Sequence, residues 1–313
     1  MTNYNILISD GLDDRGQSIL RASANVEYRD STSAEDLIQI IPEYDALVVR
    51  GQTRVTAAVL DAAPELKVIG RAGVGVDNID LESAKKHHVT VVNAPTSTTV
   101  AVAELAFGML LALAREIPRA DATLKEGQWV KKEFQGVELN GKTLGIIGFG
   151  RIGMGVSRRA AAFGMNVIIY DPNVLEHELV HGNAEPVSLQ DLFAWSDFIS
   201  LHLPLNVHTR DLLGPLAFSQ MKDSVRIVST ARGGIIDESA LLDALNSGKV
   251  AGAALDVFEK EPPGLTDLVA HPRVIATPHI GAQTAESQSR AAEDIANEVL
   301  SALRGESLRW KVV

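Results

Sequence analysis

The sequence predicts an α/β protein built from two doubly wound parallel-sheet domains, and three observations lead to this fold class. The chain has 313 residues, which is long for one ordinary domain and suits two domains of roughly 150 residues each. Short runs rich in β-branched residues alternate with helical patterns, as in βαβ units of a parallel sheet. The alternation occurs twice, once on each side of a long apolar stretch at residues 99–117.

The predicted strands form one set before the apolar stretch and a second set after it. The first set covers residues 5–10, 45–50, 67–73 and 89–95. The second set covers residues 142–150, 165–171, 197–203, 225–230, 251–258 and 273–278. The apolar stretch is predicted to be a helix that continues into a linker or arm. The last 30 residues repeat apolar positions at intervals of three and four, which predicts a final helix.

Composition narrows the class of ligand. A net charge of −11 argues against nonspecific binding of nucleic acid or anionic lipid, because phosphate neutralisation needs clustered Lys and Arg. The absence of cysteine excludes thiolate metal ligands and a cysteine nucleophile, and we predict no metal site. The apolar run 100–114 is shorter than the roughly 20 residues of a membrane-spanning helix. The start of the chain shows no secretory signal, so we expect a cytoplasmic protein with a small-molecule ligand.

A glycine-rich segment, LGIIGFGRIG at residues 144–153, lies at the junction of a predicted strand and helix. In a G-x-G-x-x-G pattern the glycines allow a tight turn, close approach to a pyrophosphate and helix packing, and the phosphate lies at the helix N-terminus. Eighteen residues later, Asp171 ends the next predicted strand and is placed to bind a ribose hydroxyl pair. Its carboxylate would repel a 2′-phosphate, which favours NAD(H) over NADP(H). The predicted phosphate-loop residues are Gly148, Gly150, Arg151, Ile152 and Gly153.

Proton transfer near neutral pH usually falls to histidine, and His279 follows a predicted strand at a sheet edge where open α/β folds bind ligands. Two possible partners, Glu259 and Glu261, follow another strand. A carboxylate bonded to one ring nitrogen fixes the tautomer and favours the imidazolium form. Spacing alone leaves both glutamates open. Arg232 follows a third strand, and its planar guanidinium suits a carboxylate.

Other histidines carry weaker signals. His202 follows the predicted strand at 197–203. It is a candidate for the cofactor site, with a locally satisfied strand-end histidine as the alternative. The remaining histidines are predicted at the surface, in loops or at a helix end: His87, His88, His177, His181, His208 and His271.

Four segments in order resemble the signatures of the D-isomer-specific 2-hydroxyacid dehydrogenase family. They are LGIIGFGRIG with Asp171, STARGGIIDE (229–238), LDVFEKEP (255–262) and TPHIGA (277–282). The resemblance selects Glu261, the glutamate before a proline, as the partner of His279. It implies hydride transfer between substrate C2 and nicotinamide C4, with His279 exchanging the hydroxyl proton and Arg232 holding the substrate carboxylate. It also adds Thr230 and Asp256 to the predicted cofactor site.

The same resemblance implies a domain layout. A Rossmann NAD-binding domain at residues 99–282, including an arm helix at 99–135, is expected to be inserted in a smaller flavodoxin-like substrate domain. That second domain would consist of residues 1–98 and 283–313. A homodimer through the arm helix is also implied.

Within the family, VVRGQTRVT (48–56) and GRAGVGVDNID (70–80) resemble most the segments of 3-phosphoglycerate dehydrogenases. The implied reaction is oxidation of D-3-phosphoglycerate to 3-phosphohydroxypyruvate, the first step of serine biosynthesis, or its reverse. A phosphate calls for cations beyond Arg232. The candidate substrate-binding residues are Arg50, Arg54, Arg71, Gly73, Val74, Gly75 and Lys131. Lys131 falls at a position where relatives have an arginine. A lysine keeps the positive charge but cannot bind a phosphate bidentately as an arginine does. The substrate could therefore carry another anionic group, such as a sulfonate.

Two alternatives stay open. A reductase of glyoxylate, hydroxypyruvate or sulfopyruvate would share the catalytic residues. The second alternative is an NAD-sensing adaptor that binds transcription factors. The presence of Arg232, Glu261 and His279 argues against this alternative. The chain ends at GESLRWKVV, so we expect no serine-binding C-terminal domain and no feedback inhibition by serine.

Overall fold

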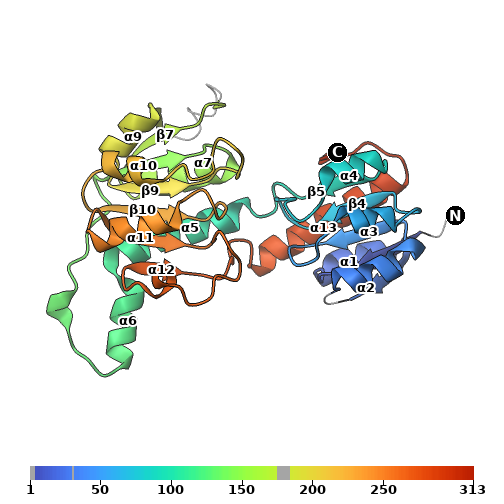
Figure 1. Ribbon diagram of the computed structural model, residues 1–313, viewed down its shortest axis with the longest axis horizontal. Helices are drawn as coiled ribbons and strands as arrows, with labels where there is room; N and C mark the ends of the chain where they lie inside the picture. Colours follow the sequence, from blue (N-terminus) through green and yellow to red (C-terminus); the bar gives the residue numbers. More distant parts are fainter. Residues whose placement is uncertain (1–3, 30–31, 175–183) are drawn as a thin grey trace. The chain divides into compact units, whose positions relative to one another are not determined.

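The computed structural model describes residues 4–29, 32–174 and 184–313. The chain divides into two compact units (Figure 1). Unit 1 consists of Met1–Thr98 and Ala282–Val313, and unit 2 is the continuous segment Thr99–Gly281. Each unit has a parallel β-sheet with helices on both faces, which confirms the predicted α/β fold class.

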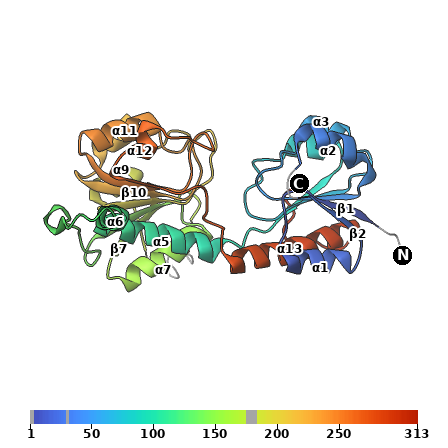
Figure 2. The same ribbon diagram turned by 90° about the horizontal axis from the view of Figure 1, so that it is seen from below.

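Unit 1 contains a five-stranded sheet in the order β2-β1-β3-β4-β5, which is the flavodoxin-like order. Its strands are β1 (Asn5–Ile8), β2 (Asn25–Tyr28), β3 (Ala46–Val49), β4 (Val68–Arg71) and β5 (Thr90–Asn93). One face is covered by α2 (Ala34–Ile40), η1 (Ile41–Glu43), α3 (Ala57–Asp61) and α4 (Leu81–Lys86). The other face is covered by α1 (Asp14–Arg21) and α13 (Ala285–Leu303) (Figure 2). The buried central strands are therefore apolar on both sides.

Helix α13 comes from the end of the chain and packs against α1 and β4. A Cβ atom at Gly16 of α1 would lie 2.6 Å from the Ala292 carbonyl oxygen, and one at Gly70 of β4 would lie 2.5 Å from Val299 Cγ2. Glycine at these two positions therefore allows the close approach. The helix ends at Leu303, so the expectation of helix to the end of the chain was wrong. The last residues instead pair with β5 through an antiparallel bridge at Lys311.

Unit 2 contains a seven-stranded sheet in the order β12-β11-β10-β9-β6-β7-β8. Its strands are β6 (Thr143–Ile147), β7 (Asn166–Tyr170), β8 (Glu185–Pro186), β9 (Phe198–Leu201), β10 (Val225–Ser229), β11 (Val250–Leu255) and β12 (Val274–Ala276). Helices α5 (Thr99–Arg115) and α7 (Arg151–Ala162) cover one face. The opposite face carries α9 (Leu189–Trp195), α10 (Pro215–Gln220), α11 (Glu238–Asn246) and α12 (Asp267–Ala270). The strand order reverses beside β6, where Rossmann-type sheets bind ligands at the carboxyl ends of their strands.

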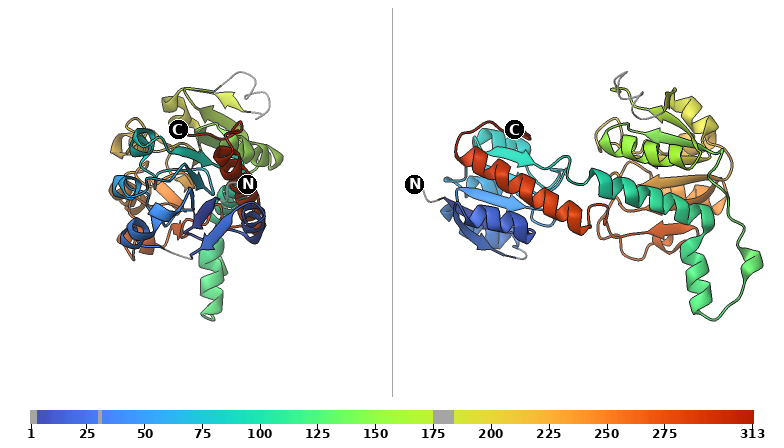
Figure 3. Two further views of the ribbon diagram at one scale, coloured as in Figure 1. Left: turned by 90° about the vertical axis from the view of Figure 1, so that its right-hand side faces the viewer. Right: turned by 180° about the vertical axis from the view of Figure 1, so that it is seen from behind.

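The segment expected as one arm helix at 99–135 is divided in the structure. Helix α5 is largely buried and belongs to the core of unit 2. The break follows at Glu116, which has a left-handed φ of 51°, and Pro118 then lies in the first turn of α6 (Ile117–Lys125). Within residues 99–135, α6 and the segment through η2 (Lys131–Glu133) are the part that extends from the body of unit 2 (Figure 3). Among the residues described in both units, no helix is long and apolar enough to cross a membrane.

Candidate active site

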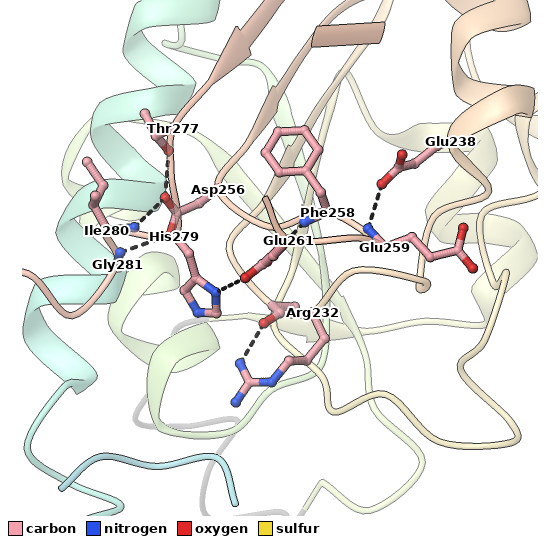
Figure 4. Close-up of polar contacts among 11 residues, drawn as sticks. Arg232, Glu238, Asp256, Phe258, Glu259, Glu261, Thr277, His279, Ile280 and Gly281 are labelled. Carbon is pink, nitrogen blue, oxygen red and sulfur yellow. Dashed lines mark hydrogen bonds and ion pairs between the residues drawn. The ribbon is translucent and has the colours of Figure 1, made fainter. Parts of the chain in front are cut away.

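The centre of the candidate site in unit 2 is a histidine bonded to a glutamate. His279 Nδ1 lies 2.7 Å from Glu261 Oε2, and the second carboxylate oxygen, Oε1, accepts a hydrogen bond of 3.2 Å from the backbone N–H of Phe258 (Figure 4). The two side chains are 49% and 38% exposed, so the pair remains open to a ligand. Because Nδ1 faces the carboxylate, Nε2 is the ring nitrogen left for a substrate.

The structure distinguishes the two glutamates that spacing left open. The Glu261 side chain turns toward His279, whereas the Glu259 side chain lies 3.7 Å from Arg210 in an exposed ion pair. The backbone N–H of Glu259 is bonded elsewhere, to the carboxylate of Glu238 at 2.7 Å. Of the two, Glu261 is the one that can orient the imidazole.

Asp256 fixes the backbone around His279. The residue is 1% exposed and follows β11, and its carboxylate accepts hydrogen bonds from the Thr277 hydroxyl and from the N–H groups of Ile280 and Gly281 at 2.6 to 2.8 Å. His279 itself has a φ of 52°, which costs on the order of 1 kcal/mol in a non-glycine residue. The three hydrogen bonds offset that strain and hold the histidine at the edge of the sheet. Sequence reasoning placed Asp256 near the cofactor and missed this role.

Arg232 lies at the carboxyl end of β10, which neighbours β11 in the sheet. Its Nη1 donates a hydrogen bond of 2.7 Å to the backbone oxygen of Ala231. This bond folds the guanidinium back along the strand end. Figure 4 draws Arg232 beside the His279–Glu261 pair. The three residues that follow three neighbouring strands are thus gathered at one edge, as a planar cation next to an imidazole–carboxylate pair.

The glycine loop is shaped for close backbone contact. Gly148 has a φ of 91°, and a Cβ atom there would lie 2.4 Å from the His202 carbonyl oxygen. A Cβ atom at Gly153 would lie 2.3 Å from the Gly148 oxygen, whereas Gly150, the N-cap of α7, faces open space. Asp171 Oδ2 accepts from the Phe149 N–H at 2.8 Å, so the carboxylate that was predicted to bind ribose lies directly beside this loop.

Three polar atoms near the carboxyl ends of β9 and β10 are shielded from solvent. They are His202 Nδ1, Ser229 Oγ and Thr230 Oγ1, and within the described part of the chain none has a hydrogen-bond partner. His202 Nε2 lies 2.8 Å from Ser200 Oγ, and burial lowers the pKa of His202 to about 3. Buried polar atoms are normally bonded, so these three point to a polar ligand. Ser229 escaped sequence reasoning because a serine in a strand carries no signal of its own.

Unit 1 has its own cluster of predicted residues at the carboxyl edge of its sheet. Val49 of β3 pairs in register with Arg71 of β4, so Arg50 follows at the same edge. A Cβ atom at Gly73 would fall 1.4 Å from Arg71 Nη1, which means that the guanidinium occupies the space beside the glycine turn. The structure thus brings Arg50, Arg71 and the Gly73 turn together.

Asp10 shapes the loop that carries Arg50. Its carboxylate accepts backbone hydrogen bonds of 2.9 to 3.0 Å from Arg50, Gln52 and Thr53, and it also accepts from the Thr53 hydroxyl. Asn78 donates to the carbonyl oxygens of Arg50 and Thr53. Sequence reasoning missed both residues, because their role depends on contacts between distant segments.

The other predicted residues differ in exposure. Arg54 and Val74 of unit 1 are exposed, and Gly75 is partly buried. In unit 2, Arg151 is exposed, and Ile152 in the first turn of α7 packs against the apolar core. Lys131 is exposed in η2, in the segment that extends from unit 2. His177 and His181 lie outside the described residues.

Comparison with known proteins identifies relatives along the whole chain. Residues 107–281 match the family described as "D-isomer specific 2-hydroxyacid dehydrogenase, NAD binding domain". The chain is 48% identical over 304 residues to D-3-phosphoglycerate dehydrogenase of Rattus norvegicus, a match that covers 97% of this chain and 57% of the relative. The chain therefore spans little more than half the length of that relative.

Two further relatives match over nearly their full lengths. Hydroxypyruvate reductase of Thermotoga maritima is 48% identical over 309 residues, covering 97% of this chain and 99% of the relative. The structure of D-lactate dehydrogenase from Aquifex aeolicus complexed with NAD and lactic acid aligns with a TM-score of 0.86 at 31% identity, covering 96% of each chain.

Proposed function

This chain belongs to the D-isomer-specific 2-hydroxyacid dehydrogenase family, and on that basis we propose that it interconverts D-3-phosphoglycerate and 3-phosphohydroxypyruvate with NAD. Its position would then be at the entry to serine biosynthesis. The observation that carries the choice of substrate is the cation cluster of unit 1, where Arg50 and Arg71 flank a glycine turn.

NAD is the cofactor of the matched family domain, and it supplies the hydride acceptor when bound. The residues present fit it. The N-terminus of α7 at Gly150 faces open space for a pyrophosphate, and the three unpartnered polar atoms described above suit the nicotinamide half. We propose that Asp171 binds the ribose hydroxyls and disfavours NADPH.

The acid/base chemistry is assigned to His279. In the oxidation direction, its Nε2 takes the proton of the substrate C2 hydroxyl while hydride leaves C2. Glu261 Oε2 lies 2.7 Å from Nδ1, accepts its proton in a hydrogen bond and stabilises the imidazolium that results. Arg232 offers its guanidinium fork to the substrate carboxylate, and in reduction it also polarises the C2 carbonyl. General acid/base catalysis of this kind contributes roughly 10²- to 10⁴-fold to rate.

The phosphate is assigned to the cations of unit 1. A phosphate oxygen pair matches the bidentate geometry of a guanidinium, and Arg71 presents one beside the Gly73 turn. Arg50 and Arg54 supply further charge, and Lys131 is a fourth candidate.

Hydroxypyruvate reduction is a second candidate, because the Thermotoga maritima relative with that name matches this chain at nearly equal length. The two substrates differ only in the phosphate. Unit 1 therefore decides between them, whereas the unit 2 chemistry is common to both.

The test is an NADH-linked panel of 3-phosphohydroxypyruvate, hydroxypyruvate, glyoxylate and sulfopyruvate at fixed pH. We expect the highest kcat/KM for the phosphorylated acid, and a selective loss of that preference in Arg71→Met. A preference for hydroxypyruvate that Arg71→Met leaves unchanged would favour the reductase. NADH binding without turnover of any acid would favour the adaptor.

We also propose a homodimer formed through α6. No α6 residue is buried, and the exposed apolar side chains Ile117, Leu124 and Trp129 lie along and just after this helix. Sedimentation of the wild type and of an Ile117→Glu, Leu124→Glu variant tests this, with a dimer expected only for the wild type.

A further inference from the structure

The loop that carries Glu261 lies directly against the loop that carries Arg232. A Cβ atom at Gly233 would fall 1.9 Å from the Phe258 carbonyl oxygen and 2.5 Å from the Glu259 nitrogen. Real Cβ atoms do not approach backbone this closely. The two loops are therefore in backbone contact, and a glycine at position 233 is what permits it.

A carboxylate from a third element fastens this contact. Glu238 is the first residue of α11, and its Oε1 accepts a hydrogen bond of 2.7 Å from the Glu259 N–H (Figure 4). The preceding amide, Phe258 N–H, donates to Glu261 Oε1, and Glu261 Oε2 meets His279. Two successive amides of one loop are thus bonded, the first to Glu261 and the second to Glu238.

Glu238 is not needed to cap its own helix. Asp237 is the N-cap of α11, and its Oδ1 accepts from the N–H groups of Ser239 and Ala240. The Glu238 carboxylate instead reaches across to the Glu261 loop. Phe258, which is 5% exposed, anchors that loop in the core on one side. The Glu238 bond fixes the peptide on the other side, where Glu259 and Lys260 are exposed.

We infer that Glu238 is a positioning residue, which sets the loop conformation from which Glu261 orients His279. It acts through the Glu259 amide. The Glu259 N–H belongs to the peptide between Phe258 and Glu259, so loss of the Glu238 bond frees this peptide to rotate. The rotation changes the course of the chain from Glu259 to Glu261 and so moves the Glu261 carboxylate relative to the Phe258 N–H and to His279. This inference rests on the role proposed above for the His279–Glu261 pair.

The experiment compares Glu238→Ala, Glu238→Asp and Glu238→Gln with the full-length wild type. Gln keeps an acceptor oxygen at the same reach, whereas Asp keeps the negative charge at the α11 N-terminus but is one methylene too short. Asp237→Ala is the matched control, because it removes the helix cap and leaves the Glu238 bond in place.

The measurements are kcat, the KM for NADH, Tm, and the downfield imidazole N–H proton resonance of His279, assigned by its loss in His279→Ala. We expect Ala and Asp to lower kcat roughly tenfold to a hundredfold, the scale of a small misplacement of a reacting group. The KM for NADH should stay unchanged, and the His279 resonance should broaden or disappear. Gln should restore both kcat and the resonance, and Asp237→Ala should lower Tm alone.

A wild-type kcat and resonance in Glu238→Asp would overturn the inference, as would an equal loss of kcat in Asp237→Ala. If Glu238→Ala does not fold, the Asp and Gln pair decides. If the wild type turns over none of the acids tested, the proposed function fails, but the His279 resonance still reports whether Glu238 positions the pair.

Discussion

His202 should make the folded protein less stable in acid. Its Nδ1 is shielded from solvent, and burial lowers the pKa from an ordinary value of 6.5 to about 3. Between these two values the unfolded chain binds a proton that the folded chain does not. Stability therefore falls as the pH decreases from about 6.5 toward 3. Above about pH 6.5 His202 is neutral in both the folded and the unfolded state, so its titration does not change the stability there.

The size of the effect follows from the two pKa values. Each pH unit inside the window changes the free energy of unfolding by up to about 1.4 kcal/mol. At pH 5 the accumulated loss is about 2 kcal/mol. This figure is a ceiling, because the residue as a whole is only partly buried.

The assay is urea unfolding at pH 7 and pH 5, followed by tryptophan fluorescence and fitted with separate transitions for the two units. His202→Gln is the test variant, since Gln keeps a polar group toward Ser200 and does not titrate. His208→Gln is the control, because His208 is exposed in the same unit. Between pH 7 and pH 5 the wild type and the control should lose more stability than His202→Gln, by up to about 2 kcal/mol. Equal losses in all three proteins would refute the argument.

Three further predictions concern activity. His279→Ala should lower kcat by roughly 10²- to 10⁴-fold while NADH binding, measured by fluorescence titration, stays near the wild-type value; an unchanged kcat would remove His279 from the mechanism. Asp171→Ala should weaken NADH binding and reduce the preference over NADPH, and a kept preference would contradict the ribose role. Asp10→Asn should raise the KM for 3-phosphohydroxypyruvate and not that for NADH, because the new amide group faces the N–H groups of the Arg50 loop. Asp45→Asn, at the other end of β3, should lower Tm only, and a matching rise in KM there would count against a local effect.

All of the strands that the sequence predicted are present, and most of them are buried apolar runs. Strands β2 and β8 were missed for a physical reason. Strand β2, Asn25–Tyr28, lies at the sheet edge with mostly exposed side chains, and β8 is two residues long. Neither has a hydrophobic pattern for a single sequence to reveal.

Site residues were predictable where a residue type suited to the reaction directly follows a predicted strand, as with Arg232 and His279. The choice between Glu259 and Glu261 was different, because both glutamates follow the same strand. This choice required the three-dimensional structure, because the direction of each glutamate side chain depends on how the loop after β11 packs against the Arg232 loop. The roles of Asp10 and Glu238 could not be predicted from the sequence for the same reason. Each residue acts by accepting backbone hydrogen bonds from a distant segment.

The divided sequence of unit 1 has a consequence for biosynthesis. At roughly 5–20 residues per second on the ribosome, helix α13 emerges on the order of ten seconds or more after β5. Until then, the sheet face that contacts Ile295 and Val299 is covered by α1 alone. Unit 2 is continuous and can complete its core first, although it is translated later. The nascent N-terminal segment therefore exposes apolar surface to aggregation until α13 has been synthesised.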